Sequence, residues 1–209
     1  MKWFRRFVER LDRHTNMEVR SSIAKGWDQL PSGAGKSAKE QRTIWIKSAM
    51  DRLDSLCDDK TRNEIMVETC PHTYPKTRIK KMRAEFKRTG NLDDLIEVMR
   101  KDKSWGGGSF YDYPTREGNI VYVTKVPYDP KAFEKATTDE ERRLAYCHCS
   151  LVKRSKEQIS PTFCCCSGGW VKQLWEGILE QPVEVELTES LLKGDDRCTH
   201  AVHLPTGLL

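Results

Sequence analysis

The chain of 209 residues has 36 lysine and arginine residues against 31 aspartate and glutamate residues, which gives a formal net charge of +5 at pH 7. This length can bury the core of one domain or of two small ones. No stretch of about 18 apolar residues occurs, which excludes a membrane-spanning helix, and the first residues are too charged for the core of a signal peptide. We therefore expect a cytoplasmic protein whose eight cysteines stay reduced.

The first half of the chain has the spacing of amphipathic helices. Near the N-terminus, Phe4, Phe7, Val8 and Leu11 share one face of a predicted helix. A helix of this kind can lie on a membrane surface or bind a partner. One short helix is a weak signal, however, so packing on the protein's own core is the favoured interpretation.

Local signals predict where two further helices begin. Ser37 with Glu40, and Thr61 with Glu64, have the spacing of capping boxes, in which each side chain satisfies a free backbone N–H group. Both pairs are followed by apolar residues at helical spacing. The front half of the chain is therefore predicted to be mostly helical.

The next predicted helix is strongly basic, with seven lysine and arginine residues and one acid between residues 76 and 88. A helix with that charge can contact the phosphates of a nucleic acid. Ile79, Met82 and Phe86 also give it the apolar stripe of an ordinary amphipathic helix with a solvated face. We favour this second interpretation and do not expect a nucleic acid partner.

A change in pattern divides the chain. Gly90 ends one predicted helix, and Asn91 caps the next. The segment Trp105–Ser109, which is rich in glycine, then ends the helical pattern. We therefore predict two regions: a mostly helical and basic region, residues 1–105, and an α+β cysteine-rich region, residues 106–209.

Strands are predicted only in the second region. Phe110–Tyr113 and Ile120–Lys125 have the composition of two strands of a hairpin. Apolar and polar residues alternate over Val183–Thr188, which is the period of a half-buried strand, and Cys198–Leu204 is predicted to return beside it. These strands predict an antiparallel sheet.

Helices of the second region complete the predicted fold. Thr138 with Glu141 is a capping box that opens a helix leading into the cysteine-rich segment. Ser160 followed by Pro161 has the pattern of an N-cap and a first helical residue. The expected fold class is thus α+β: a helical N-terminal half, followed by an antiparallel sheet with packed helices.

Six of the eight cysteines lie between residues 147 and 198, and such clustering is typical of metal or redox chemistry. A helix packed on the antiparallel strands would bring Cys164 and Cys198 together, with Cys147 and Cys149 arriving on the preceding segment. These four residues are the set that we predict to ligate zinc, with Cys166 as a substitute for any one of them. Ordinary buried thiols remain the alternative.

Other residues near this cluster receive weaker predictions. His148 would point away from its two neighbours if the segment is extended, so it is not favoured as a ligand. Cys165, on a different helix face from its neighbours, is predicted to be a small buried side chain. Cys57, Cys70 and His72 match no zinc spacing, but they could join the cluster if the two halves of the chain pack together.

The cysteine-rich region resembles the 4-vinyl reductase-type domain, a small-molecule-binding module of bacteriochlorophyll biosynthesis proteins and phenol-sensing regulators. The matching pattern is a helix with Cys, four residues, Gly and an aromatic residue, here Cys164 to Gly169-Trp170. A strand with glutamate and then Gly-Asp-x-x-Cys follow, here Gly194 to Cys198. The resemblance implies that family's fold, with a ligand pocket between the helix from Pro161 and a curved antiparallel sheet. The same cysteine blocks also resemble those of a group of bacterial proteins without a known activity.

The resemblance also bears on zinc. Family members that bind zinc use the helix cysteine, a cysteine eight residues before the last one, and the last cysteine. Cys164 and Cys198 match two of these positions, whereas Ser190 occupies the middle one. Because serine is a poor zinc ligand, Cys147 and Cys149 would have to complete the site.

The resemblances imply two possible functions. The first is a small-molecule-binding or sensory protein with a structural zinc site and a small apolar or aromatic ligand. The candidate lining residues are Trp170, Trp175, Phe163, Tyr122 and Tyr146. The alternative is a cysteine-dependent hydrolase, because a similar Gly-Asp-x-x-Cys ending occurs in the family resembling 2-aminothiazoline-4-carboxylate hydrolase. Cys166 or Cys147 would then be the nucleophile, and a homodimer remains open in either case.

Overall fold

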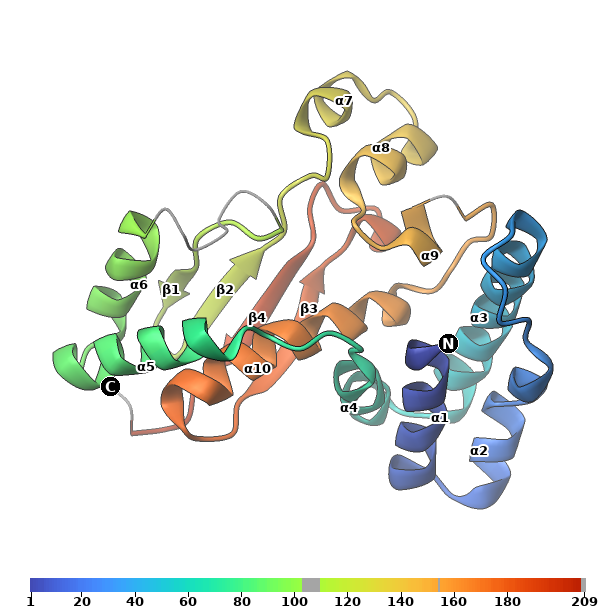
Figure 1. The fold of residues 1–209 in the computed structure, drawn as a ribbon, viewed down its shortest axis with the longest axis horizontal. Helices are drawn as coiled ribbons and strands as arrows, with labels where there is room; N and C mark the ends of the chain where they lie inside the picture. Colours follow the sequence, from blue (N-terminus) through green and yellow to red (C-terminus); the bar gives the residue numbers. More distant parts are fainter. Residues whose placement is uncertain (103–109, 154, 208–209) are drawn as a thin grey trace.

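The computed structural model describes residues 1–102, 110–153 and 155–207. Its fold is α+β, as the sequence predicts: helices dominate, and four strands form one antiparallel sheet. Among the described helices, none is both long and apolar enough to cross a membrane. The helices within residues 2–69 lie to one side of the sheet, and α10 (Gly168–Leu179) lies across it (Figure 1).

The N-terminal helices enclose the first of two hydrophobic cores. They are α1 (Lys2–His14), α2 (Met17–Ile23), the short η1 (Trp27–Gln29), α3 (Lys36–Leu56) and α4 (Asp59–Thr69). The predicted apolar face of α1 is confirmed, because Phe4, Phe7, Val8 and Leu11 are all buried in this core. The first helix therefore packs on the protein itself.

The second core lies between the sheet and three helices: α5 (Lys76–Thr89), α6 (Leu92–Lys101) and α10 (Gly168–Leu179). The strands are β1 (Thr115–Glu117), β2 (Ile120–Thr124), β3 (Glu184–Glu189) and β4 (Thr199–His203), in the order β1-β2-β4-β3. Val121, Val202 and Val185 are paired across three strands and belong to this core. Because side chains alternate along a strand, Tyr122 points to the opposite face.

Short helices join these parts and shape the site described below. They are α7 (Pro130–Lys135), α8 (Asp139–Tyr146), α9 (Ser150–Lys153), η3 (Pro161–Ser167) and η4 (Leu191–Lys193). The capping box of Thr138 with Glu141 is confirmed, as is the N-cap role of Ser160, whose hydroxyl accepts the N–H of Thr162. The helix after Pro161 begins as a 3₁₀ turn and continues as α10.

Two predicted caps and one predicted strand are wrong in position. The helix α3 begins after Gly35 rather than Ser37, and α4 is capped by the Asp58 carboxylate, which accepts the N–H of Thr61 at 2.7 Å. Because the Asp58 carboxylate already accepts a backbone N–H at the start of α4, this helix begins before the predicted cap Thr61. The first hairpin strand is Thr115–Glu117 instead of 110–113, since the turn at Gly118, with φ of 56°, pairs Glu117 with Ile120.

The predicted boundary at 105–109 lies outside the described residues, and the division at this point stays a prediction. Contacts cross it, however, because α5 packs on α10. Arg83 donates from Nε to the Gly177 carbonyl at 2.7 Å, and Glu180 forms ion pairs with Arg83 at 2.8 Å and Lys87 at 2.6 Å. Part of the charge of the basic helix is therefore paired within the chain.

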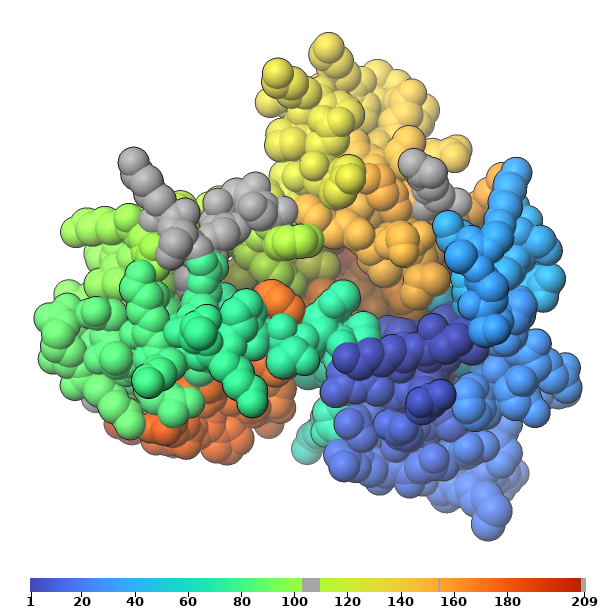
Figure 2. All heavy atoms as spheres, in the orientation of Figure 1, coloured from blue at the N-terminus to red at the C-terminus, as the bar shows by residue number. Residues whose placement is uncertain are grey.

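The two cores meet where the first turn of α10 crosses the end of α4. A Cβ atom at Gly169 would overlap the Val67 carbonyl oxygen and lie 2.5 Å from the Cβ atom of Cys70. Only glycine therefore permits this approach, which carries the cysteines of η3 toward Cys70. Figure 2 shows the two parts as neighbouring masses, the N-terminal helices in blue and the part built on α5 and α10 in green and orange.

We predict that Gly169→Ala lowers the free energy of unfolding by about 1–3 kcal/mol, because an added methyl group must push two packed elements apart. Urea unfolding followed by circular dichroism measures this change. The control is Gly33→Ala, where the nearest atom to the new Cβ would be 3.9 Å away. Equal stability of the two variants would contradict the role given to this contact.

Candidate functional site

A cavity of about 420 Å³ lies at the junction of the two cores. Its lining comes from α1, the end of α4, the end of β2, the segment around α8 and α9, η3, α10 and the start of β4. The aromatic and imidazole side chains of the lining are Trp3, His72, Phe110, Tyr111, Tyr146, His148, Phe163 and Trp170. The thiols are Cys70, Cys147, Cys149, Cys164, Cys166 and Cys198.

All four predicted zinc ligands line this cavity, together with the predicted substitute Cys166. In the described part of the chain, no three His, Cys, Asp or Glu side chains are close enough together to hold a metal ion. The thiols would therefore have to move toward one another to form a zinc site, and zinc stays a prediction. Ser190, at the position where the resemblance places a cysteine, is fully buried, with its Oγ atom 4.0 Å from the Cys198 Sγ atom.

Three of the five predicted ligand-lining residues reach the cavity: Trp170, Phe163 and Tyr146. Trp175 is fully buried in the core between α10 and the sheet, and Tyr122 lies on the other face of the sheet, so neither lines it. The space under the middle of α10 is filled by core side chains. The cavity lies instead beyond its N-terminal end.

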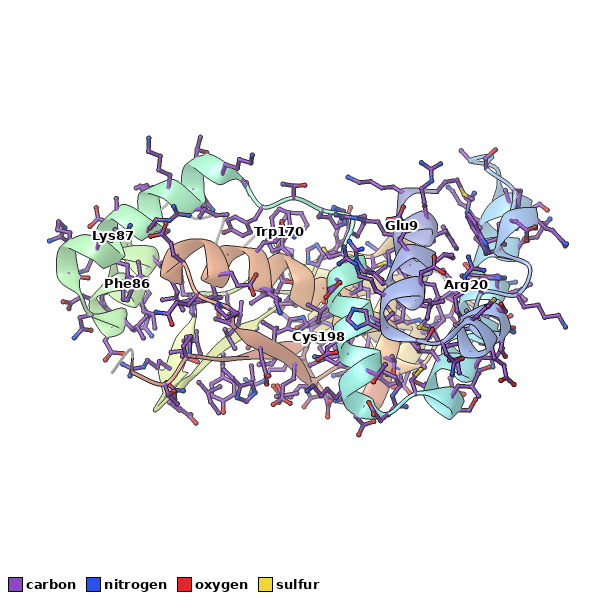
Figure 3. All side chains as sticks on the ribbon, turned by 90° about the horizontal axis from the view of Figure 1, so that it is seen from below. Glu9, Arg20, Phe86, Lys87, Trp170 and Cys198 are labelled. Atoms are coloured by element: carbon purple, nitrogen blue, oxygen red, sulfur yellow. The ribbon has the colours of Figure 1, made fainter. Side chains whose placement is uncertain are left out.

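The segment that joins α4 to α5 closes one side of the cavity. Trp170 lies on α10 beneath this segment, with its ring centroid 4.8 Å from that of Tyr74 and 6.2 Å from that of His72 (Figure 3). Cys70 and His72 thus join the cavity, which the sequence left open, whereas Cys57 packs against the first core. The two halves of the chain share one site.

Lys125 is a cavity residue that the sequence analysis did not single out. Its N–H donates to the Cys198 carbonyl at 2.8 Å, and its carbonyl accepts the Tyr146 hydroxyl at 2.5 Å. That hydroxyl also accepts the Cys198 N–H at 2.9 Å, so three segments are tied together. A signal was present: Val121, Val123 and Lys125 follow the period of two that places them on the buried face of β2.

Two uncharged polar side chains, Ser167 and His200, lie next to each other beside the cavity wall. Ser167 donates from Oγ to the Cys164 carbonyl at 2.7 Å, and the same oxygen is 2.9 Å from Nε2 of His200. His200 is fully buried, and burial, followed by the charge of Lys125, lowers its pKa to about 3. The imidazole is therefore uncharged near pH 7.

The cavity thiols differ in acidity. Burial raises the pKa of Cys147 to about 11, and burial also raises the pKa of Cys164 far above its ordinary value. The pKa of Cys70 is lowered to about 7, first by the hydrogen bond from Cys166 and then by the backbone N–H of His72, against the effect of burial. Of Cys70, Cys147 and Cys164, Cys70 therefore has the most thiolate character near neutral pH.

Two side chains of α1 hold Cys70 and its hydrogen-bond partner Cys166 in place. The Trp3 indole donates to the Cys166 Sγ atom at 3.3 Å, and the Arg6 guanidinium donates to the Cys70 carbonyl. Both donors come from α1. The N-terminal helix thus supports the wall of the cavity as well as the first core.

Comparison with known proteins places the match in the second half of the chain. A family of unknown function (DUF6144) matches residues 137–206, about a third of the chain. The matched stretch runs from the cap of α8 to just past β4 and contains five of the six cavity thiols. No curated protein and no solved structure matches the chain.

We predict that iodoacetamide alkylates Cys70 with a pH midpoint near 7, because the thiolate is the reactive form. Mass spectrometry of each cysteine peptide across a pH series gives the midpoints, with Cys147 expected near 11. Cys166→Ala removes the thiol donor and should move the Cys70 midpoint upward, whereas Cys166→Ser keeps a donor. A Cys70 midpoint at or above the ~8.5 of free cysteine would contradict the assignment.

Proposed function

We propose that this protein binds a small, largely apolar or aromatic molecule in the cavity. The observation that carries the proposal is the cavity itself, whose volume of about 420 Å³ falls in the range of small-molecule sites. Its walls are mainly aromatic rings and thiols, with few charged groups. Such a lining buries the apolar surface of a ligand, while the few polar groups orient it.

The arrangement of α10 on an antiparallel sheet supports the finer proposal of a 4-vinyl reductase-like domain. The helix motif Cys164 to Gly169-Trp170 lies where it would shape a pocket in such a domain, since both Cys164 and Trp170 line the cavity. The Gly-Asp-x-x-Cys motif has a structural reason as well. Gly194 adopts a left-handed conformation with φ of 94°, and the Asp195 carboxylate accepts the Ser190 N–H at 2.7 Å. This turn delivers Cys198 to the cavity wall.

A cysteine-dependent hydrolase is the second candidate, and the lowered pKa of Cys70 favours it. The nucleophile would then be Cys70 rather than Cys166 or Cys147. Burial raises the pKa of Cys147, and the hydrogen bond to Cys70, followed by burial, raises the pKa of Cys166. Both of these thiols are therefore poor nucleophiles near neutral pH.

Binding is tested with N-phenyl-1-naphthylamine, a neutral probe whose fluorescence rises in apolar surroundings. We expect saturable binding that Ser150→Trp weakens at least about tenfold, because Ser150 is an exposed residue of the cavity lining and a bulky side chain there occupies the space. The matched control is Glu184→Trp, on an exposed position of β3 outside the lining. Absence of saturable binding, or equal binding by both variants, would refute the proposal.

Zinc bound by the cavity cysteines is the further part of this proposal. Protein purified without chelator is expected to hold about one equivalent of zinc per chain, measured by mass spectrometry of the metal. Cys164→Ser and Cys198→Ser should lose the metal, because serine does not replace thiolate as a zinc ligand. Cys57→Ser, outside the cavity, should keep it. Wild-type protein without zinc would remove the metal from the proposal.

A further inference from the structure

The charge of the cavity lining is unbalanced. Among the described residues, the lining contains Lys125 but no aspartate or glutamate, and none of the ion pairs of these residues involves Lys125. The lining also contains His72 and His148, but an imidazole carries no negative charge. Burial lowers the pKa of His148. The cavity therefore offers one positive charge that no carboxylate of the described chain neutralises.

The backbone of Lys125 is held in place by bonds to two other segments. Lys125 follows β2 and is held by Cys198 on one side and by Tyr146 on the other, at 2.8 and 2.5 Å. It also forms an isolated bridge with Tyr111. The side chain of Lys125 therefore starts from a fixed backbone position in the cavity wall.

An unpaired ammonium in such surroundings is unfavourable unless an anion meets it. Removal of a charged group from water costs free energy that a partner of opposite charge recovers. Lys125 keeps partial contact with solvent, and the ordinary pKa of a lysine side chain, ~10.4, leaves the group cationic near pH 7. Apolar walls around a single cation favour a ligand with an apolar body and one negative charge.

We infer that the cavity takes a small organic acid, with its carboxylate against the Lys125 ammonium and its apolar or aromatic body against Trp170, Phe163 and Tyr146. This inference rests on the proposed function and names its ligand class. One ammonium matches one unit of negative charge, which a carboxylate supplies. The aromatic walls recognise the rest of the molecule by burying it.

Cys70 is the one competing anion on the cavity wall. Its thiolate is stabilised first by Cys166 and then by the His72 backbone, and the charge of Lys125 contributes less than the charge of Arg6. The thiolate is therefore held mainly by its own neighbours. Cys70→Ala removes the thiolate. This variant therefore shows whether a preference for an acid depends on Lys125 or on Cys70.

The test uses a matched pair of probes, 1-naphthoate and the neutral 1-naphthamide, titrated by calorimetry into the full chain with its zinc content measured alongside. We expect naphthoate to bind at least about tenfold more tightly than the amide. Lys125→Met, which keeps an apolar stem, should abolish this preference and leave amide binding unchanged, which also shows that the variant is folded. Lys125→Arg should keep part of the preference, and Cys70→Ala should keep all of it.

The outcomes are distinct. Equal binding of the two probes by the wild-type chain, or a preference that survives Lys125→Met, overturns the organic-acid inference and leaves the binding function standing. A preference lost in Cys70→Ala assigns it to the thiol and overturns the role of Lys125. Binding of neither probe rejects the proposed function together with the inference.

Discussion

The close approach of α10 to α4 at Gly169 is the constraint on which the rest of the structure depends. Glycine lets the backbone of α10 lie against the Val67 carbonyl and the Cys70 side chain. A helix that is fixed there joins the core of the N-terminal helices to the core built on the sheet. Because η3 directly precedes α10, the same contact sets the position of Cys164 and Cys166. One small residue thus determines both the packing of the two cores and the geometry of the cavity wall.

The cavity lies at this junction for a physical reason. Each core is closed by its own apolar side chains, and the crossing of two rigid elements leaves space that neither core fills. The groups around that space are rings, thiols and main-chain bonds whose partners are satisfied, such as the Tyr146 hydroxyl between Lys125 and Cys198. Preformed walls of this kind would lower the ordering cost of binding a ligand.

Local signals predicted much of the fold because they act within a few residues. The Asn91 cap, the left-handed Gly90, the capping box at Thr138 and the strand alternation after Val183 are all confirmed. The site depended on contacts between residues far apart in the sequence. Nothing local indicates that Trp3 donates to a thiol 163 positions away, or that Cys70 meets Cys166. Lys125 was missed although its position in the alternation of β2 already placed it on the buried face.

The zinc and organic-acid proposals make opposite demands on the same cavity. Four thiolates around a zinc ion carry a net charge of about −2, and the ammonium of Lys125 would leave about −1, which repels a carboxylate. Without the metal, the described lining carries the positive charge of Lys125, which the Cys70 thiolate offsets only in part, and it attracts a carboxylate. With zinc bound, Lys125 would be the counter-ion of the thiolate cluster, and without the metal it would be the recognition group for the proposed ligand. Bound zinc would therefore reduce the preference of the cavity for an acid over its amide, and the zinc content of the protein would decide how large that preference is.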